Sequence, residues 1–276
     1  MNTPVVSIIM STYNNSKYVR EAIDSVLRQS FISWEFIILN DASTDNTDEI
    51  IRSYAKNDLR FKYSRNTKNE GQTSNLNKGI EFAKGEFIAI IDGDDVWTDE
   101  NKLKKQINFL TDNNEYGLVG SLWVATNESG EMMSRITYPT TDARIRDYLL
   151  IEDCFLHSSV VIRKTVLNKI GHYDIKYRWA QDYDLWLRIG IVSKFHNIPE
   201  YMVSYRVNQS GISHTKYKEQ LYETYEIVKN YKKMYPNSIK GSILWHLRTY
   251  FPVWFKKLIS KNIVHILQSK SNLKYV

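Results

Sequence analysis

Two hydrophobic patterns alternate along the first part of the chain. Runs of consecutive apolar residues, rich in β-branched side chains, predict buried strands at residues 5–10, 34–39, 61–64 and 87–91. Between these runs, apolar positions recur three or four residues apart, which predicts amphipathic helices. One helix is expected over residues 16–29, one carries Ile50, Ile51 and Tyr54, and one carries Leu76, Ile80 and Ala83. This alternation is typical of a parallel, doubly wound α/β sheet.

Two residues are predicted to mark helix ends. Asp45 precedes the second helix, and its carboxylate is suited to capping a helix N-terminus. Gly85 follows the third helix, where a C-cap glycine is expected.

The second half of the chain has a less regular pattern. Helices are predicted around Leu103, Ile107 and Leu110, over 142–150 and 181–191, and as a long stretch that opens at His214. Strands are predicted at 117–125, 132–138, 155–162 and 202–207. The predicted fold is α/β, with a Rossmann-like, mostly parallel central sheet flanked by helices and a C-terminal helical extension.

Polar loops follow three of the predicted strands, at residues 12–14, 41–43 and 92–95. In doubly wound sheets, ligands bind beyond the carboxyl ends of the strands. We therefore expect these loops to converge on one site. The glycine patterns of dinucleotide-binding folds and of phosphate-binding P-loops are absent from the sequence, which disfavours both.

Residues 92–95 place three carboxylates within four residues at the end of an apolar run. Such charges repel one another, and oxygen-only ligands suit a hard cation such as Mg²⁺ or Mn²⁺. Gly93 would let the backbone pass close to a bound group. The alternative interpretation is an acidic turn whose carboxylates are solvated.

Composition narrows the choice of partner only slightly. The net charge of +6 and the pI of about 9.1 favour polyanions, anionic membrane surfaces or phosphorylated small molecules. The basic residues are spread along the chain without a recognised nucleic-acid-binding motif, so no nucleic acid is expected as a partner. The single cysteine, Cys154, excludes an intramolecular disulfide and a cysteine-based zinc site. It fits a reducing compartment, and with no apolar run of spanning length we expect a cytoplasmic protein.

The last part of the chain, residues 242–276, mixes apolar and aromatic residues with lysine, arginine and histidine. This pattern predicts a basic amphipathic helix lying on the inner face of the cell membrane. The alternative is a helix packed against the domain or against another subunit of a homo-oligomer.

Five segments, taken together, resemble the motifs of the family 2 glycosyltransferases. They occur in order at residues 6–14, 41–45, 69–79, 92–95 and 182–188. The resemblance implies a GT-A fold and the transfer of a sugar from a nucleotide-sugar with inversion at the anomeric carbon. Three features depart from the family pattern: Gln181 stands where glutamate is frequent, Leu76 stands where many members have arginine, and one residue is inserted after Trp97, around Glu100.

The resemblance also implies roles for individual residues. The nucleotide-sugar would be bound by residues from the first four motifs, namely Thr12, Tyr13, Asn14, Asp41, Gly71, Asn77, Asp92, Gly93 and Asp95. Tyr13 and Asp41 would contact the base, and Asp92 would lie near the ribose or the donor sugar. Asp94 would bind the Mn²⁺ or Mg²⁺ ion that bridges the diphosphate, with His214 as a second candidate ligand. Asp182 would be the general base.

Three further residues have two interpretations each. His157 could face the acceptor or pack in the core, and Trp179 could stack on a sugar ring or pack in the core. Arg206 lies in a segment, shared with His214, that is similar to a family loop able to close over the donor.

The sequence thus predicts a metal-dependent inverting glycosyltransferase, a hexosyl- or N-acetylhexosaminyl-transferase. It would move a sugar, with a UDP-sugar as the expected donor, to a glycan or lipid-linked oligosaccharide in cell-surface polysaccharide synthesis. The alternative is a catalytically weak, nucleotide-sugar-binding scaffold subunit of a polysaccharide assembly. The predicted catalytic domain spans 1–213, with a donor half at 1–98 and an acceptor half at 99–213, and the extension spans 214–276.

Overall fold

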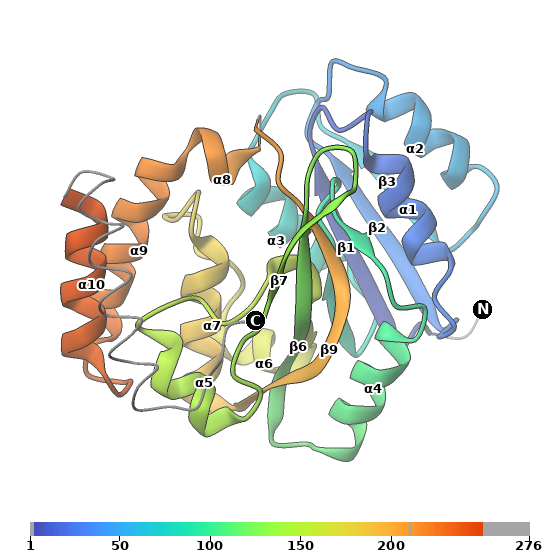
Figure 1. The fold of residues 1–276 in the computed structure, drawn as a ribbon. Helices are drawn as coiled ribbons and strands as arrows, with labels where there is room; N and C mark the ends of the chain where they lie inside the picture. The colour runs from blue at the N-terminus through green and yellow to red at the C-terminus, as the bar shows by residue number, and fades with distance from the viewer. Residues whose placement is uncertain (1–2, 210, 251–276) are drawn as a thin grey trace.

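The computed structural model describes residues 3–209 and 211–250, and they form one sheet with helices on both faces (Figure 1). The strands are β1 (Val6–Thr12), β2 (Trp34–Asn40), β3 (Phe61–Arg65), β4 (Phe87–Ile90), β5 (Val96–Trp97), β6 (Tyr116–Thr126), β7 (Met132–Ile136), β8 (Val161–Arg163) and β9 (Lys194–Arg206). Their order in the sheet is β3-β2-β1-β4-β8-β6-β9-β5, and β7 pairs with β6.

The helices follow the predicted positions closely in the first half of the chain. They are α1 (Val19–Leu27), α2 (Thr47–Ala55), α3 (Gln72–Phe82), α4 (Lys102–Asp112), α5 (Asp142–Leu149), α6 (Lys164–Ile170), α7 (Gln181–Val192), α8 (Ile212–Thr215), α9 (Tyr217–Tyr231) and α10 (Ser238–Tyr250). A 3₁₀ turn, η1 (His157–Ser159), precedes β8.

The N-terminal half of the sheet confirms the predicted parallel, doubly wound arrangement. Strands β3, β2, β1 and β4 are all parallel. Alternate residues of β1 point to opposite faces: Ile8 packs with α1 and α2, whereas Ile9 packs with α3. Because both faces are covered, the strands are apolar throughout.

The other half of the sheet is mixed rather than parallel. Strand β8 is antiparallel to β4 and β6, β5 is antiparallel to β9, and only β6 and β9 are parallel there. The predicted strand at 155–162 is wrong over its first part, because residues 157–159 form η1 and the strand begins at Val161. The predicted strand at 202–207 is the end of the longer β9, which contains a register shift opposite Leu122.

Gly85 does not cap a helix. Helix α3 ends at Phe82, and Ala83 after it is already extended. A Cβ atom on Gly85 would lie 2.5 Å from the backbone nitrogen of Ser7, so glycine is required by the close approach to β1. Asp45 lies one residue before the N-cap of α2, and its carboxylate accepts the N–H of Thr47 at 3.0 Å.

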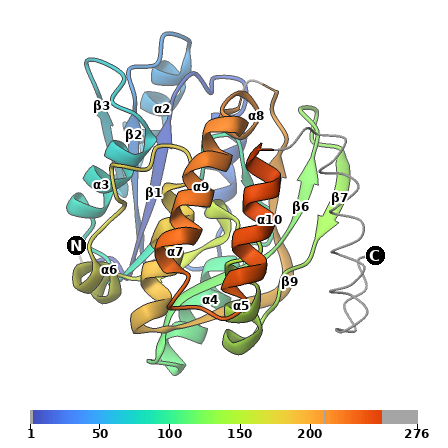
Figure 2. The ribbon, with the colours of Figure 1, turned by 90° about the vertical axis from the view of Figure 1, so that its left-hand side faces the viewer.

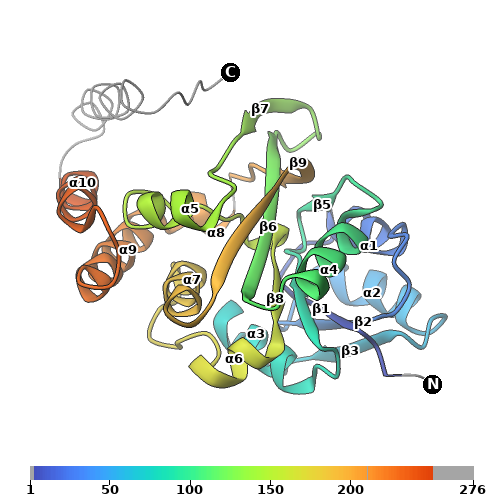
Figure 3. The same cartoon turned by 90° about the horizontal axis from the view of Figure 1, so that it is seen from below.

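The C-terminal helices α9 and α10 lie side by side and cover α7 (Figures 2 and 3). Helix α10 also contacts the segment after α5, where Trp245 Nε1 donates to the Leu150 carbonyl at 3.1 Å. A Cβ atom on Gly241 would lie 2.3 Å from that carbonyl oxygen. Up to Tyr250, therefore, the extension packs on the domain; the rest of the predicted amphipathic segment, 251–276, lies outside the described residues. No helix among residues 3–209 and 211–250 is long and apolar enough to cross a membrane.

Candidate active site

The first two predicted loops are bonded to each other at the carboxyl ends of β1 and β2. Asn14 Oδ1 accepts the N–H of Thr44 at 2.8 Å, and the Asn14 N–H donates to Ser43 Oγ at 3.0 Å. Asn14 and Ala42 both adopt left-handed backbone conformations, with φ of 53° and 60°. Asparagine tolerates this region, but for alanine it costs about 1–2 kcal/mol. The loops are thus held in a fixed shape by each other.

Asp41 is buried and holds the turn that begins α3. Its carboxylate accepts the N–H groups of Glu70 at 2.8 Å and Gly71 at 2.9 Å, as well as Asn66 Nδ2 at 2.9 Å. Gly71 has a φ of 89°, which favours glycine. Tyr13, 46% exposed, lies after β1. The contact of Tyr13 and Asp41 with a base stays a prediction.

Asn77 and Thr12 have well-defined protein partners. Asn77 forms a reciprocal pair with the backbone of Tyr173, its Oδ1 accepting the N–H and its Nδ2 donating to the carbonyl, both at 2.9 Å. Thr12 Oγ1 accepts Asn15 Nδ2 at 3.2 Å. Gly93 lies against these same side chains, since a Cβ atom there would be 2.7 Å from Thr12 Oγ1. The donor contacts predicted for these residues stay predictions.

Asp92 lies just after β4 and connects several elements. It accepts Gln72 Nε2 from α3 at 2.9 Å, and His157 Nδ1 lies 3.2 Å from its Oδ2. His157 Nε2 in turn lies 2.9 Å from the Tyr173 hydroxyl. Burial lowers the pKa of His157, but Asp92 and Asp182 outweigh burial, so that the pKa is raised. His157 is therefore both buried, as in the core interpretation, and directed at the predicted site.

Asp94 and Asp95 have different surroundings. Asp95 is buried and accepts the Ser158 hydroxyl and the backbone N–H of Arg206, the latter at 3.0 Å. Asp94 is partly exposed. Burial and the neighbouring Asp92 raise the pKa of Asp94 to about 6. Burial, together with Asp94 and Asp92, raises the pKa of Asp95 well above its usual value.

Arg206 forms hydrogen bonds to this acidic turn. It is buried at the end of β9, where its Nε donates to the Asp94 carbonyl at 3.1 Å. Its other guanidinium nitrogens bond to Glu21 of α1 and to the Glu128 carbonyl. Arg206 thus links the acidic turn to α1 and to the loop that contains Glu128. The resemblance of its segment to a family loop did not predict this role.

The acidic turn is compatible with a divalent cation. Among the described residues, no three histidine, cysteine or acidic side chains converge as a ready-made ligand set. Mg²⁺ and Mn²⁺, however, commonly bind through one or two carboxylates plus substrate phosphates. Burial and, after it, the neighbouring Asp92 raise the pKa of Asp94, and a bound cation would oppose both effects. His214, exposed on α8, stays only a predicted ligand.

Asp182 lies in the first turn of α7, close enough to His157 for the two side chains to influence each other's pKa. Its Oδ1 accepts the N–H of Tyr183 at 2.8 Å. Burial raises the pKa of Asp182, His157 opposes this, and Asp92 adds to it, so that the net shift is upward. A carboxylate with a raised pKa is a better proton acceptor near neutral pH. Beside it, Gln181 Nε2 bonds Gln72 Oε1 at 3.3 Å, which links α7 to the residue that bonds Asp92.

Some residues of this site were not predicted. Gln72, Ser158 and Tyr173 bond to Asp92, Asp95 and His157, but their residue types and positions gave no signal in the sequence. Trp179 is partly exposed, and the charged groups of Arg178 and Lys216 lie 5.4 Å and 5.6 Å from its ring centre. It is therefore not packed in the core.

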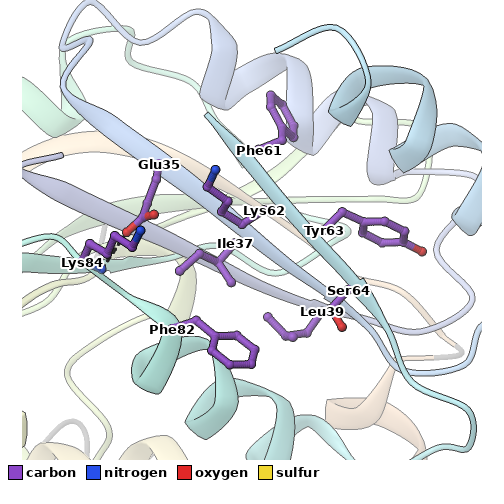
Figure 4. A pocket seen from close by; sticks show the side chains of 9 residues that line it. All are labelled: Glu35, Ile37, Leu39, Phe61, Lys62, Tyr63, Ser64, Phe82 and Lys84. Carbon is purple, nitrogen blue, oxygen red and sulfur yellow. Dashed lines mark hydrogen bonds between the residues drawn. The ribbon is translucent and has the colours of Figure 1, made fainter. Parts of the chain in front are cut away.

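A groove of about 390 Å³ lies elsewhere, along β2 and β3 at the open edge of the sheet (Figure 4). Ile37, Leu39 and Phe82 form its apolar wall, with Lys62 and Lys84 among its polar residues. None of the candidate site residues lines it.

Comparison with known proteins identifies the family. Residues 7–171, more than half of the chain, match the family model described as Glycosyl transferase family 2. The chain belongs to this family. As a family 2 glycosyltransferase, it has the segments at 41–45, 69–79 and 92–95 inside the matched range. The segment at 6–14 starts one residue before that range, and the segment at 182–188 lies beyond it.

A curated relative and two solved structures illustrate the likeness. The chain is 32% identical over 225 residues to the Escherichia coli UDP-Glc:alpha-D-GlcNAc-diphosphoundecaprenol beta-1,3-glucosyltransferase, covering 79% of this chain and 83% of that protein. S. aureus TarS 1-349 in complex with UDP-GlcNAc has a TM-score of 0.68 at 19% identity, covering 88% of this chain and 72% of that one. Mannosyltransferase from Pyrobaculum calidifontis in complex with GDP-Man and Mn²⁺ has a TM-score of 0.67 at 17% identity, covering 98% and 76%. These likenesses confirm the predicted GT-A fold.

Proposed function

We propose that this family 2 glycosyltransferase is metal-dependent and inverting, and that it transfers a sugar from a UDP-sugar. One observation carries the proposal: the carboxylates predicted for the donor side and for proton transfer meet around a single buried histidine. His157 is in hydrogen-bond contact with Asp92, and both Asp92 and Asp182 raise its pKa. Inverting transfer needs two carboxylate sites with separate tasks, one at the donor and one at the acceptor hydroxyl.

The residues divide the reaction as follows. Asp182 would take the proton of the acceptor hydroxyl as that oxygen attacks the anomeric carbon, on the face opposite the departing diphosphate. Its raised pKa suits this task. Asp94 would hold the Mn²⁺ or Mg²⁺ ion, which when bound supplies compensation for the charge that develops on the diphosphate. Asp92, fixed by Gln72 and His157, would orient the donor between them.

The acceptor proposed is a glycan or a lipid-linked oligosaccharide of cell-surface polysaccharide synthesis. Support comes from the printed name of the E. coli relative, whose acceptor is a sugar diphosphoundecaprenol. Its donor, UDP-Glc, and the UDP-GlcNAc bound to the S. aureus structure support the choice of a UDP-sugar. A lipid-linked acceptor would be held in a membrane, and binding of the basic C-terminal segment to the membrane surface would bring the enzyme close to it.

Release of nucleoside diphosphate from a panel of nucleotide-sugars tests the proposal. With Mn²⁺ and a lipid-linked or glycan acceptor present, we expect turnover that EDTA abolishes. Asp182→Asn should lower kcat by roughly 10²–10⁴-fold, the range that removal of a positioned general base produces. Asp94→Asn should also lower kcat, because the metal ion that compensates the diphosphate charge loses its proposed ligand. Asp112→Asn is the matched control, because Asp112 is exposed at the far end of α4.

The outcomes separate the alternatives. Binding of a nucleotide-sugar without turnover on any acceptor would favour the scaffold interpretation. If no nucleotide-sugar binds, the proposed function is wrong.

A further inference from the structure

Helix α7, which carries Asp182, has an N-cap residue that makes no side-chain capping bond. The residue at its N-cap position is Ala180, which has no side-chain oxygen, and the first N–H groups of any helix need partners from elsewhere. The segment that leads into α7, residues 178–180, is instead held by the C-terminal helix α9. The carboxylate of Glu223 accepts the N–H groups of Arg178 at 3.1 Å, Trp179 at 2.7 Å and Ala180 at 2.9 Å.

A second side chain of α9 completes this contact. Gln220, one turn before Glu223, donates its Nε2 to the Trp179 carbonyl at 3.0 Å. Residues 178–180 are therefore held at four backbone groups by two side chains of one helix. The negative charge of Glu223 also lies at the positive end of the α7 dipole, where it is favourable.

From these contacts we infer that Glu223 is a positioning residue for Asp182. Ala180 precedes Asp182 by two residues, so a shift of the 178–180 segment moves the first turn of α7 and the carboxylate on it. Displacements of about 1 Å in a reacting group can reduce a rate by ~10²-fold. The inference rests on the proposed function, in which Asp182 is the proton acceptor.

The docking of α9 does not depend on Glu223 alone. Ile227 and Val228 of α9 are buried in the same core as Trp186 and Leu187 of α7. The Tyr231 hydroxyl donates to Asp184 Oδ1 at 3.0 Å, and the Tyr235 hydroxyl to the Leu187 carbonyl at 2.6 Å. Removal of Glu223 should therefore leave α9 in place while it frees the segment before Asp182.

Three variants of the full chain test the inference: Glu223→Ala, Glu223→Gln and the control Glu226→Ala. Glu226 is exposed on the same helix and bonds only Lys229 among the described contacts. We expect Glu223→Ala to lower kcat about 10–100-fold. The Kd and the stoichiometry of nucleoside diphosphate binding with Mn²⁺, measured by calorimetry, should stay within about twofold, because the donor side is untouched. Glu223→Gln should recover part of the rate, since one amide oxygen can still accept the Trp179 and Ala180 N–H groups.

Each result has a defined meaning. If Glu223→Ala has the kcat of Glu226→Ala, or if its kcat falls only in proportion to the binding stoichiometry, Glu223 has no positioning role. If Glu223→Ala does not fold, Glu223→Gln is compared with Glu226→Gln by hydrogen exchange. At least the Arg178 amide, which loses the oxygen that accepts it, must then exchange faster in Glu223→Gln, and equal exchange overturns the inference. Failure of the wild-type protein to turn over any donor would instead contradict the proposed function.

Discussion

At the scale of single residues, Lys102 is unusual because lysine side chains are normally exposed and this one is buried. It is completely buried in the first turn of α4. Its Nζ donates to Gln106 Oε1 at 2.8 Å and lies 4.2 Å from the centre of the Trp97 ring. Burial lowers the pKa of Lys102 well below its usual value, and Asp99 compensates only in part. An ammonium group with so few partners costs folding free energy.

We therefore expect Lys102→Met to stabilise the protein at neutral pH. The midpoint of thermal unfolding should rise by about 2–8 °C, whereas the exposed neighbour Lys104→Met should change little. Because the pKa of Lys102 is lower in the folded state, the unfolded chain binds more protons between that pKa and 10.5. The free energy of unfolding of the wild type should thus increase relative to that of the variant as pH rises through this window. A lower midpoint for Lys102→Met at pH 7 would contradict this account.

The candidate site shows what single residues reveal without a structure. The carboxylates of residues 92–95 and Asp182 were predicted from their order and from the family resemblance. The family resemblance assigned the metal ion to Asp94 and not to Asp95. The residue types alone could not do so, because the two differ in burial: Asp95 is occupied by Ser158 and Arg206. Nor could they predict Glu223, whose partners are backbone N–H groups that carry no residue signature.

At the scale of elements, Gly85 fixes how closely two segments approach. A Cβ atom there would meet the backbone of Ser7 at 2.5 Å and of Val6 at 2.7 Å. Backbone atoms cannot rotate away as a side chain can, so the segment leading into β4 would be pushed off β1.

Gly85→Ala should therefore lower the free energy of unfolding by about 1–3 kcal/mol, the usual cost of overpacking. Chemical denaturation would measure the loss. Lys84→Ala, a change at the exposed neighbouring residue, should stay within about 0.5 kcal/mol of wild type. Equal stability of both variants would show that the two segments can separate without cost.

Prediction of elements succeeded where periodicity was unbroken and failed where tertiary contacts interrupt it. The strands and helices up to β4 were predicted nearly in full, because their apolar positions follow one pattern. Residues 157–159 were predicted as part of a strand. In the structure they form η1, in which His157 and Ser158 contact Asp92 and Asp95. Only the end of strand β9 was predicted, because the strand begins with polar residues and includes Pro199.

At the scale of the whole molecule, local sequence patterns could not predict the mixed strand directions in the second half of the sheet. Strand direction depends on which strands pair, and β4 pairs with β8 across more than seventy residues of chain. The membrane interpretation of the C-terminal segment also changes: α10 packs on the domain up to Tyr250, although Ile239 and Ile243 on it are exposed. Membrane contact is therefore expected mainly from residues 251–276, which carry four aromatic residues among several lysines.

Flotation with vesicles tests this expectation. The full chain should float with vesicles that contain anionic phospholipid, and a chain ending at Tyr250 should not. Zwitterionic vesicles are the control, because they lack the attraction for lysine. A cut after Tyr250 keeps α10 and its contact with Leu150, so a loss of folding does not confuse the result. Equal flotation of both chains would refute the membrane role of the tail.

The contact of Glu223 with residues 178–180 has a consequence for the order in which the protein becomes active during synthesis. Domains begin to fold from the N-terminus as the chain emerges. The donor-side loops are complete once β9 has formed, since Arg206 at its end bonds the acidic turn, and by then Asp182 has been translated. The groups that secure its helix, however, follow some forty residues later, on α9. A nascent chain would therefore be able to hold a nucleotide-sugar before it can transfer the sugar, and catalysis begins only when the C-terminal helices have docked.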